Sequence, residues 1–238
     1  MPAQTPSRPI GAHVPVAGGL AAGGLRYAAE IGAETIQVFV SNPRGWAPSA
    51  GDAQQDTALR HHVASTGLPV FVHSTYLINL GSPDPVTRQR SAASLAHSLR
   101  RGRDIGALGV VVHTGSAVRA SREQGRRHVR ECLLPLLDSL GDDGPDVLLE
   151  PTAGLGQMLC GAASKDGCGS HRDRHENIGA GQIGIAPFAA LLRHPATRGV
   201  PFIVETPGPH AAVAADIATL KALRRKGQAA CAPAGAMR

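Results

Sequence analysis

The amino-acid sequence predicts an α/β fold, most specifically a TIM-type (β/α)8 barrel that is incomplete, with about six of the eight strands recognisable. Strand-like and helix-like segments alternate strictly along much of the chain. The strand-like segments are continuous apolar runs, which is typical of parallel strands covered by helices. Polar residues recur where these runs end, at the rim that carries the active site in such barrels.

Each strand is predicted from a short apolar run that stops at a polar or turn-forming sequence. IGAHVPV and TIQVFV are rich in β-branched residues, and TIQVFV stops at the turn sequence SNPR. LPVFVH and GVVVH end in histidine, whereas DVLLE and PFIVE end in glutamate. The expected strands are residues 10–16, 35–40, 68–73, 109–113, 146–150 and 201–205.

Helices are predicted between the strands, where apolar residues recur at three- and four-residue steps. The stretch 85–105 carries such a face at Ala92, Leu95, Ala96 and Leu99. The stretch 121–140 carries another at Val129, Cys132, Leu133, Leu136 and Leu137. The expected helices are residues 20–31, 52–65, 85–105, 121–140, 186–193 and 211–225.

The alternation fails between residues 155 and 184, where no β-rich run occurs. Compact domains rarely contain a structureless connection of that length. One barrel domain is therefore expected over residues 10–226, with a loose N-terminus at 1–9 and a disordered tail at 227–238.

Composition sets broad limits on function. The chain of 238 residues has a formal net charge of +6 and a pI near 9.7, which suits a polyanionic partner such as nucleic acid, although solubility alone would explain it nearly as well. The four cysteines form no C-x-x-C pair, so a cysteine zinc site is not expected. Without a signal-peptide core or a membrane-length apolar run, the chain is expected in the cytoplasm with no membrane partner.

Imidazoles and carboxylates gather at the predicted rim. His13, His73, His113 and Glu150 lie at or near the ends of four strands, and Glu205 ends the last one. The polar segment 170–184 adds Asp173 and His175 at a two-residue spacing, which lets both side chains point the same way from an extended chain. These donors suit zinc, with manganese as an alternative, and metal-assisted hydrolysis. We expect His13 to touch the site without being a ligand.

Several longer motifs resemble the endonuclease IV family of apurinic/apyrimidinic endonucleases. The most specific are STYLINL and DRHENIG followed by GQIG, and all of them occur in family order from about residue 10 to 225. The matching stretches are GAHVPVAGGL (11–20), VFVSNPRGW (38–46), VHSTYLINLGSP (72–83), VVVHTGS (110–116), LLEPTAG (148–154), SKDGCGSHRDRHENIGAGQIG (164–184) and PFIVET (201–206).

The resemblance implies a cluster of up to three zinc ions at the barrel rim, and hydrolysis of the phosphodiester 5′ to abasic sites in DNA during base-excision repair. It places His73 and His113 on the first metal. Glu150, also the expected catalytic residue, bridges the first and second metals, and Glu205 binds the second. Asp173 and His175 bind the third.

The sequence departs from the family pattern after Glu150. The family's sixth and seventh strands supply three further ligands, from an Asp-Thr-Cys-His motif and from a His before an Asn-Asp-Ser segment. Neither motif occurs here, because LLEPTAGLGQMLC leads almost directly into SKDGCGSHRDRH. This departure matches the missing strands and indicates an internal deletion of about two βα units, with fewer metals bound and weaker binding.

The resemblance also implies contacts with double-stranded DNA containing abasic sites. Arg44, Tyr76 and Leu77 match residues that enter the duplex to bend it and expose the lesion, a use of wedge side chains that abasic sites favour. We expect a monomer. Two alternatives stay open: a non-catalytic DNA-binding remnant, and a TIM-barrel sugar isomerase or epimerase, against which the TYLINL run argues.

Overall fold

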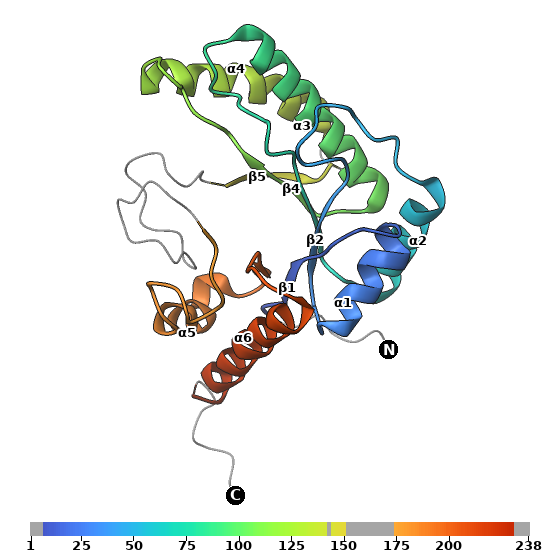
Figure 1. The fold of residues 1–238 in the computed structure, drawn as a ribbon, viewed down its shortest axis with the longest axis vertical. Coiled ribbons are helices and arrows are strands. Elements are labelled where there is room, and N and C mark those ends of the chain that lie inside the picture. The colour runs from blue at the N-terminus through green and yellow to red at the C-terminus, as the bar shows by residue number, and fades with distance from the viewer. Residues whose placement is uncertain (1–6, 142–143, 151–173, 231–238) are drawn as a thin grey trace, which may run out of the picture.

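The computed structural model describes residues 7–141, 144–150 and 174–230 (Figure 1). The described strands form one sheet in the order β5-β4-β3-β2-β1-β6, with every pairing parallel. The carboxyl ends of parallel strands all lie at the same edge of the sheet, so the polar strand ends meet at one rim. The strands are β1 (Ile10–His13), β2 (Ile36–Phe39), β3 (Val70–His73), β4 (Gly109–His113), β5 (Asp146–Glu150) and β6 (Phe202–Val204).

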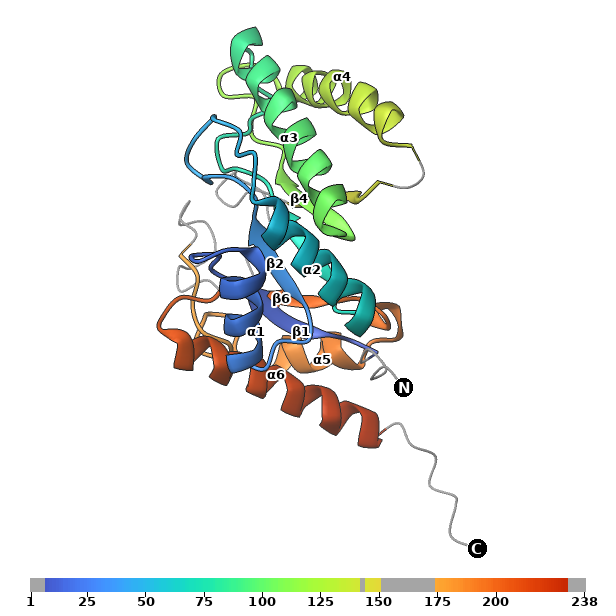
Figure 2. The same cartoon turned by 90° about the vertical axis from the view of Figure 1, so that its right-hand side faces the viewer.

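The helices pack on the outside of a curled sheet (Figures 1 and 2). None of the described helices is both long enough and apolar enough to cross a membrane. They are the π-helical segment η1 (Leu20–Leu25), α1 (Arg26–Glu30), α2 (Ala53–Thr66), α3 (Pro85–Ile105), α4 (Arg122–Leu140), α5 (Ala186–Arg193), the short 3-10 helix η2 (Pro195–Thr197) and α6 (His210–Ala230).

Local capping explains why the longer helices begin and end where they do. Asp52 accepts hydrogen bonds from the N–H groups of Gln54 and Gln55 at the start of α2, and Asp84 does the same for Val86 and Thr87 at the start of α3. Each helix ends at a glycine in the left-handed region, with φ 71° at Gly67 and 75° at Gly106. Since these caps are local, the sequence predicts the bounds of α3 correctly.

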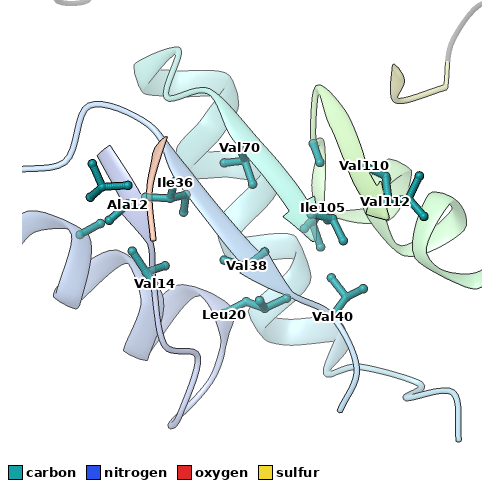
Figure 3. Close-up of a cluster of buried hydrophobic side chains, with 14 of the residues drawn as sticks. Ala12, Val14, Leu20, Ile36, Val38, Val40, Val70, Ile105, Val110 and Val112 are labelled. Carbon is teal, nitrogen blue, oxygen red and sulfur yellow. The ribbon is translucent and has the colours of Figure 1, made fainter. Parts of the chain in front are cut away.

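The core lies between the sheet and its outer helices (Figure 3). Aliphatic side chains from neighbouring strands and from α3 are almost completely removed from water, and each buried Val, Leu or Ile stabilises the fold by about 1.5–3 kcal/mol relative to an exposed position. The main contributors are Ala12, Val14, Ile36, Val38, Val70, Val72, Leu95, Leu99, Ile105, Val110 and Val112.

The described sheet confirms the expected incomplete barrel. Its six strands curl without closing, and β5 and β6 are its two outer strands. Three elements differ from expectation. The expected strand at 10–16 ends at His13. The expected helix at 20–31 opens as the π-helical segment η1 and ends at Glu30, and α6 continues to Ala230, into the expected tail. The expected ligand Asp173 lies outside the described residues.

Candidate metal centre

Three of the predicted side chains meet at the ends of adjacent strands. His73, His113 and Glu150 are the last residues of β3, β4 and β5, and the register pairs His113 directly with Glu150. Oε2 of Glu150 lies 3.5 Å from Nε2 of His73 and 3.9 Å from Nε2 of His113. One ligand atom from each of the three residues lies within 4.8 Å of the other two.

Backbone carbonyl groups fix which ring nitrogen of each histidine faces the group. Nδ1 of His73 lies 2.6 Å from the carbonyl oxygen of Ser74, and Nδ1 of His113 lies 3.4 Å from that of Glu150. A carbonyl oxygen only accepts, so Nδ1 donates the hydrogen in both contacts and Nε2 carries the lone pair of the neutral ring. This is the arrangement that orients histidine ligands in metal sites.

The donor set fits a divalent cation better than it fits direct hydrogen bonding. His73 is 2% exposed, and its Nε2 makes no hydrogen bond within the described part of the chain. At 3.5 Å the nearest carboxylate oxygen is too distant for a good hydrogen bond. Ligand atoms that share a tetrahedral zinc ion are about 3.4 Å apart, because each lies about 2.0–2.2 Å from the metal. The two separations from Oε2 of Glu150, 3.5 and 3.9 Å, are close to that value.

The electrostatics keep the carboxylate ionised. The contact with His73 lowers the pKa of Glu150, burial opposes this, and the fields of His113 and His175 add to the lowering. Burial alone would lower the pKa of His73, but Glu150, the carbonyl oxygen of Ser74 and Glu205 outweigh it and raise the pKa. The group therefore attracts positive charge, whether a proton or a cation.

A second part of the rim is built around Glu205, which directly follows β6. The amide nitrogen of Gln37, from β2, donates to Oε1 of Glu205 and to Nδ1 of His13, which lies 3.0 Å away. Burial, together with the charge of His73, lowers the pKa of His13 to about 4, so its ring is neutral and can accept this hydrogen bond. His13 thus holds Gln37, and Gln37 orients the Glu205 carboxylate.

The segment after residue 174 is held against β6 and α6 by polar contacts. Nδ1 of His175 donates to the carbonyl oxygen of Glu205 at 2.6 Å, which makes Nε2 the lone-pair nitrogen of the neutral ring. The side-chain amide of Asn177 donates to the carbonyl oxygen of Pro207 and to the carboxylate of Asp216, a buried residue of α6. The same carboxylate also accepts from the N–H of Ile178. These bonds place the His175 ring beside Glu205.

Aromatic rings line the floor between the two groups. Phe39 and Tyr76 each lie 5.4 Å from the ring of His73, and Phe39 also contacts His13 at 4.4 Å, measured between ring centroids. Burial and the carboxylates of Glu205 and Glu150 raise the pKa of Tyr76. A cavity of about 270 Å³ opens here, lined by His13, Tyr76, His175, Val204, Glu205, Thr206 and Val213.

The predicted DNA-contacting residues lie on two loops that are joined to each other. The N–H of Tyr76 donates to the carbonyl oxygen of Pro43 at 2.9 Å, so the loop after β3 is fastened to the loop that carries Arg44. Arg44 is exposed, Tyr76 is 53% exposed and Leu77 is half-buried. The two loops thus present their side chains beside the metal group.

The structure therefore brings together all the described residues that the sequence predicts for the rim, with His73, His113 and Glu150 as the tightest group. It adds Gln37, Asn177 and Asp216, which sequence reasoning missed. The available signal for Gln37 was an amide inside the apolar run TIQVFV, where a buried polar side chain needs partners.

Comparison with known proteins gives the family of the chain. The family described as Xylose isomerase-like TIM barrel matches residues 25–164, more than half of the chain. Proteins named probable endonuclease 4 from Streptomyces coelicolor and Streptomyces avermitilis are 46% and 44% identical; the alignments cover 92% and 94% of this chain and 96% and 94% of theirs. The first alignment spans 282 positions, more than the 238 residues present here, so that relative has internal residues without a counterpart.

Solved structures show the same relationship. The crystal structure of endonuclease IV from Thermus thermophilus is 27% identical, with a TM-score of 0.78 and coverage of 92% of this chain and 99% of that one. A structure of L-ribulose 3-epimerase has a TM-score of 0.64, covers 96% of this chain and 100% of that one, and at 15% identity shares only the fold. By the matched family and by its relatives, this chain belongs to the endonuclease IV family of Xylose isomerase-like TIM barrels.

Proposed function

We propose that this chain is a metal-dependent apurinic/apyrimidinic endonuclease that hydrolyses the phosphodiester 5′ to abasic sites in DNA, and that it works with fewer than three zinc ions. The observation that carries the proposal is the convergence of the Nε2 atoms of His73 and His113 on one carboxylate oxygen of Glu150. The names of its relatives support nuclease chemistry.

Under this proposal His73, His113 and Glu150 would hold one zinc ion, and Glu150 and Glu205 would supply the negative charge for a second. His175 would be a donor for a further position, which is not expected to be filled in this chain; its expected partner Asp173 lies outside the described residues. Imidazole and carboxylate donors suit zinc and also accept manganese.

A bound divalent ion supplies a neutralising charge for the phosphodiester and lowers the pKa of a coordinated water molecule. The protein's own residues do the orienting. Carbonyl contacts hold the imidazoles of His73 and His113 in the required tautomer, and Gln37 fixes the carboxylate of Glu205. Tyr76 keeps its phenolic proton because its pKa is raised, so it can donate to a phosphate oxygen.

DNA would be engaged by the two joined loops. Arg44 and Tyr76 are exposed at the rim, and Leu77, which is half-buried, would enter the duplex together with Tyr76. Side chains of this kind unstack base steps and stabilise bent DNA, and a nucleotide without its base is the least costly one to extrude. The abasic strand would then lie across the metal group.

Replacing Glu150 with glutamine tests the proposal. Glu150→Gln removes the charge that faces both imidazoles while keeping the size of the side chain, so incision of abasic duplex should fall below detection and bound zinc should decrease. Incision is measured on end-labelled duplex with and without EDTA, and zinc by elemental analysis. The matched control, Glu30→Gln, changes an exposed carboxylate of α1 and should leave both unchanged.

The outcomes separate the proposal from its alternatives. EDTA-sensitive cutting that Glu150→Gln abolishes supports the endonuclease. Tight binding of abasic duplex without any cutting by the unaltered chain indicates the non-catalytic DNA-binding protein instead. Metal-dependent epimerisation of a sugar, without affinity for duplex DNA, indicates the third alternative.

A further inference from the structure

A group of arginines covers the first half of α4 and the loop that leads into it. Arg119 lies in the loop after β4, and four more lie on the helix; all five side chains are exposed. None of them makes an ion pair or a side-chain hydrogen bond with another described residue. We call this set the α4 arginine patch: Arg119, Arg122, Arg126, Arg127 and Arg130.

The patch is unfavourable for the isolated helix. Arg122, Arg126 and Arg130 follow one another at four-residue steps, so like charges line one helix face and repel. The first turns of a helix are also the positive end of its dipole, where cations are disfavoured. Glu123 is the only acidic residue between positions 119 and 130. Glu123, in the first turn and four residues before Arg127, and Glu131 offset part of this cost, and a polyanion would offset more of it.

The patch begins at the end of the strands that carries the metal group. A short loop joins His113, the last residue of β4, to the start of α4, so the arginines follow directly from the rim. The helix runs along the outside of α3, away from the middle of the sheet (Figures 1 and 2). Arg122 to Arg130 span about 12 Å at 1.5 Å per residue, which equals roughly three to four phosphate steps along one DNA strand.

We propose that the α4 arginine patch binds the phosphate backbone of duplex DNA beyond the lesion and so holds the substrate against this side of the open barrel. The proposal rests on the proposed function, because it takes DNA as the ligand of the rim. Contacts of this type carry no sequence information and release counterions, so they strengthen binding to damaged and undamaged duplex alike.

Salt dependence of binding tests the patch directly. Affinity of the full chain for a long undamaged duplex is measured by fluorescence anisotropy at a series of KCl concentrations, in EDTA, so that neither metal nor incision contributes. In Arg122→Gln/Arg126→Gln, the slope of log K against log salt should decrease by about 1.8, since each phosphate contact contributes about 0.9. Affinity for abasic and undamaged duplex should fall by the same factor.

A second double variant supplies the matched control. Arg193→Gln/Arg198→Gln removes the same net charge from exposed positions that precede β6, at the opposite end of the sheet from the rim. Its salt slope should stay unchanged. Arg127→Gln/Arg130→Gln should reproduce the effect of the first pair, and Arg122→Lys/Arg126→Lys should retain the slope because the charges remain.

Equal losses in the patch and control variants, or an unchanged slope in both patch pairs, would overturn the proposal. The test is independent of catalysis. If the chain binds DNA through the patch and never incises it, the catalytic proposal fails and the patch stands. If the chain incises abasic DNA but the patch variants leave the slope of log K against log salt unchanged, the patch proposal fails and the catalytic proposal stands.

Discussion

At the scale of single residues, the rim is organised by side chains that contact backbone carbonyl groups or one another across strands. The rings of His73, His113 and His175 each direct Nδ1 toward a carbonyl oxygen. Gln37 performs the equivalent task for Glu205 and depends on a neutral His13. The protonation state of one half-buried ring therefore bears on the orientation of the Glu205 carboxylate.

The depressed pKa of His13, about 4, predicts a pH-dependent stability. Between pH 6.5 and 4 the unfolded chain binds a proton that the folded chain does not, so the stabilisation is complete above pH 6.5 and is lost as the pH falls toward 4. His13→Asn keeps an acceptor for Gln37 but does not titrate. As the pH falls from 6.5 to 4, the free energy of unfolding of His13→Asn should decrease less steeply than that of the unaltered protein. The two slopes should differ by up to about 1.4 kcal/mol per pH unit.

Urea unfolding of the metal-free protein at several pH values checks this. Both proteins retain His73, whose raised pKa acts in the opposite direction, so the difference between them isolates His13. Parallel pH profiles for the two proteins would show that His13 titrates normally in the folded state.

At the scale of elements, α2 and α3 are joined by a buried ion pair. Both terminal nitrogens of Arg101 donate to Asp56, at 2.7 and 2.8 Å, and the side chains are 7% and 12% exposed. Such a pair gives a defined geometry between helices, but its desolvation offsets much of the Coulombic gain. The cost of breaking it therefore greatly exceeds its net contribution.

Asp56→Ala should lower the free energy of unfolding by about 3–5 kcal/mol, because it leaves a buried guanidinium with only the exposed Asp104, 3.6 Å away, as counter-charge. The double variant Asp56→Leu/Arg101→Met should recover most of that loss. Asp138→Ala, at an exposed position of α4, should change stability by less than about 0.5 kcal/mol. Chemical denaturation measures all three, and a double variant no more stable than the single one would contradict the argument.

At the scale of the whole molecule, the open barrel explains why the proposed metal complement is reduced. β5 and β6 stand at the two edges of the described sheet, where a closed barrel would have further strands between them. The Streptomyces coelicolor relative has internal residues without a counterpart here. Loss of whole βα units removes ligands together with the strands that carry them.

Restoring those residues should increase both metal content and activity. A chimaera that carries the relative's extra segment between Cys160 and Ser164 should bind more zinc per chain and incise abasic duplex faster than the unaltered chain. The control inserts a Gly/Ser-rich segment of equal length, which costs little in loop-closure entropy and adds no ligand. Equal zinc content in all three proteins would show that the missing strands do not limit metal binding.

The parts of this molecule that could be predicted from sequence are those set by local chemistry. The bounds of α3 follow from its caps, and the rim positions of His73, His113 and Glu150 follow from where apolar runs stop. The partnership of Gln37 with Glu205 could not be predicted, because it joins residues 168 positions apart. The π-helical opening of η1 likewise has no local signal in its run of small residues.

The carbonyl contacts of the three histidines have a consequence for how the site would bind a metal ion. A ring that is already held by its own strand or neighbour has little rotational freedom left to lose, so capture of an ion requires almost no rearrangement. Differences in affinity between this chain and longer members of its family should then reflect how many donors are present, and hardly at all how well ordered each donor is.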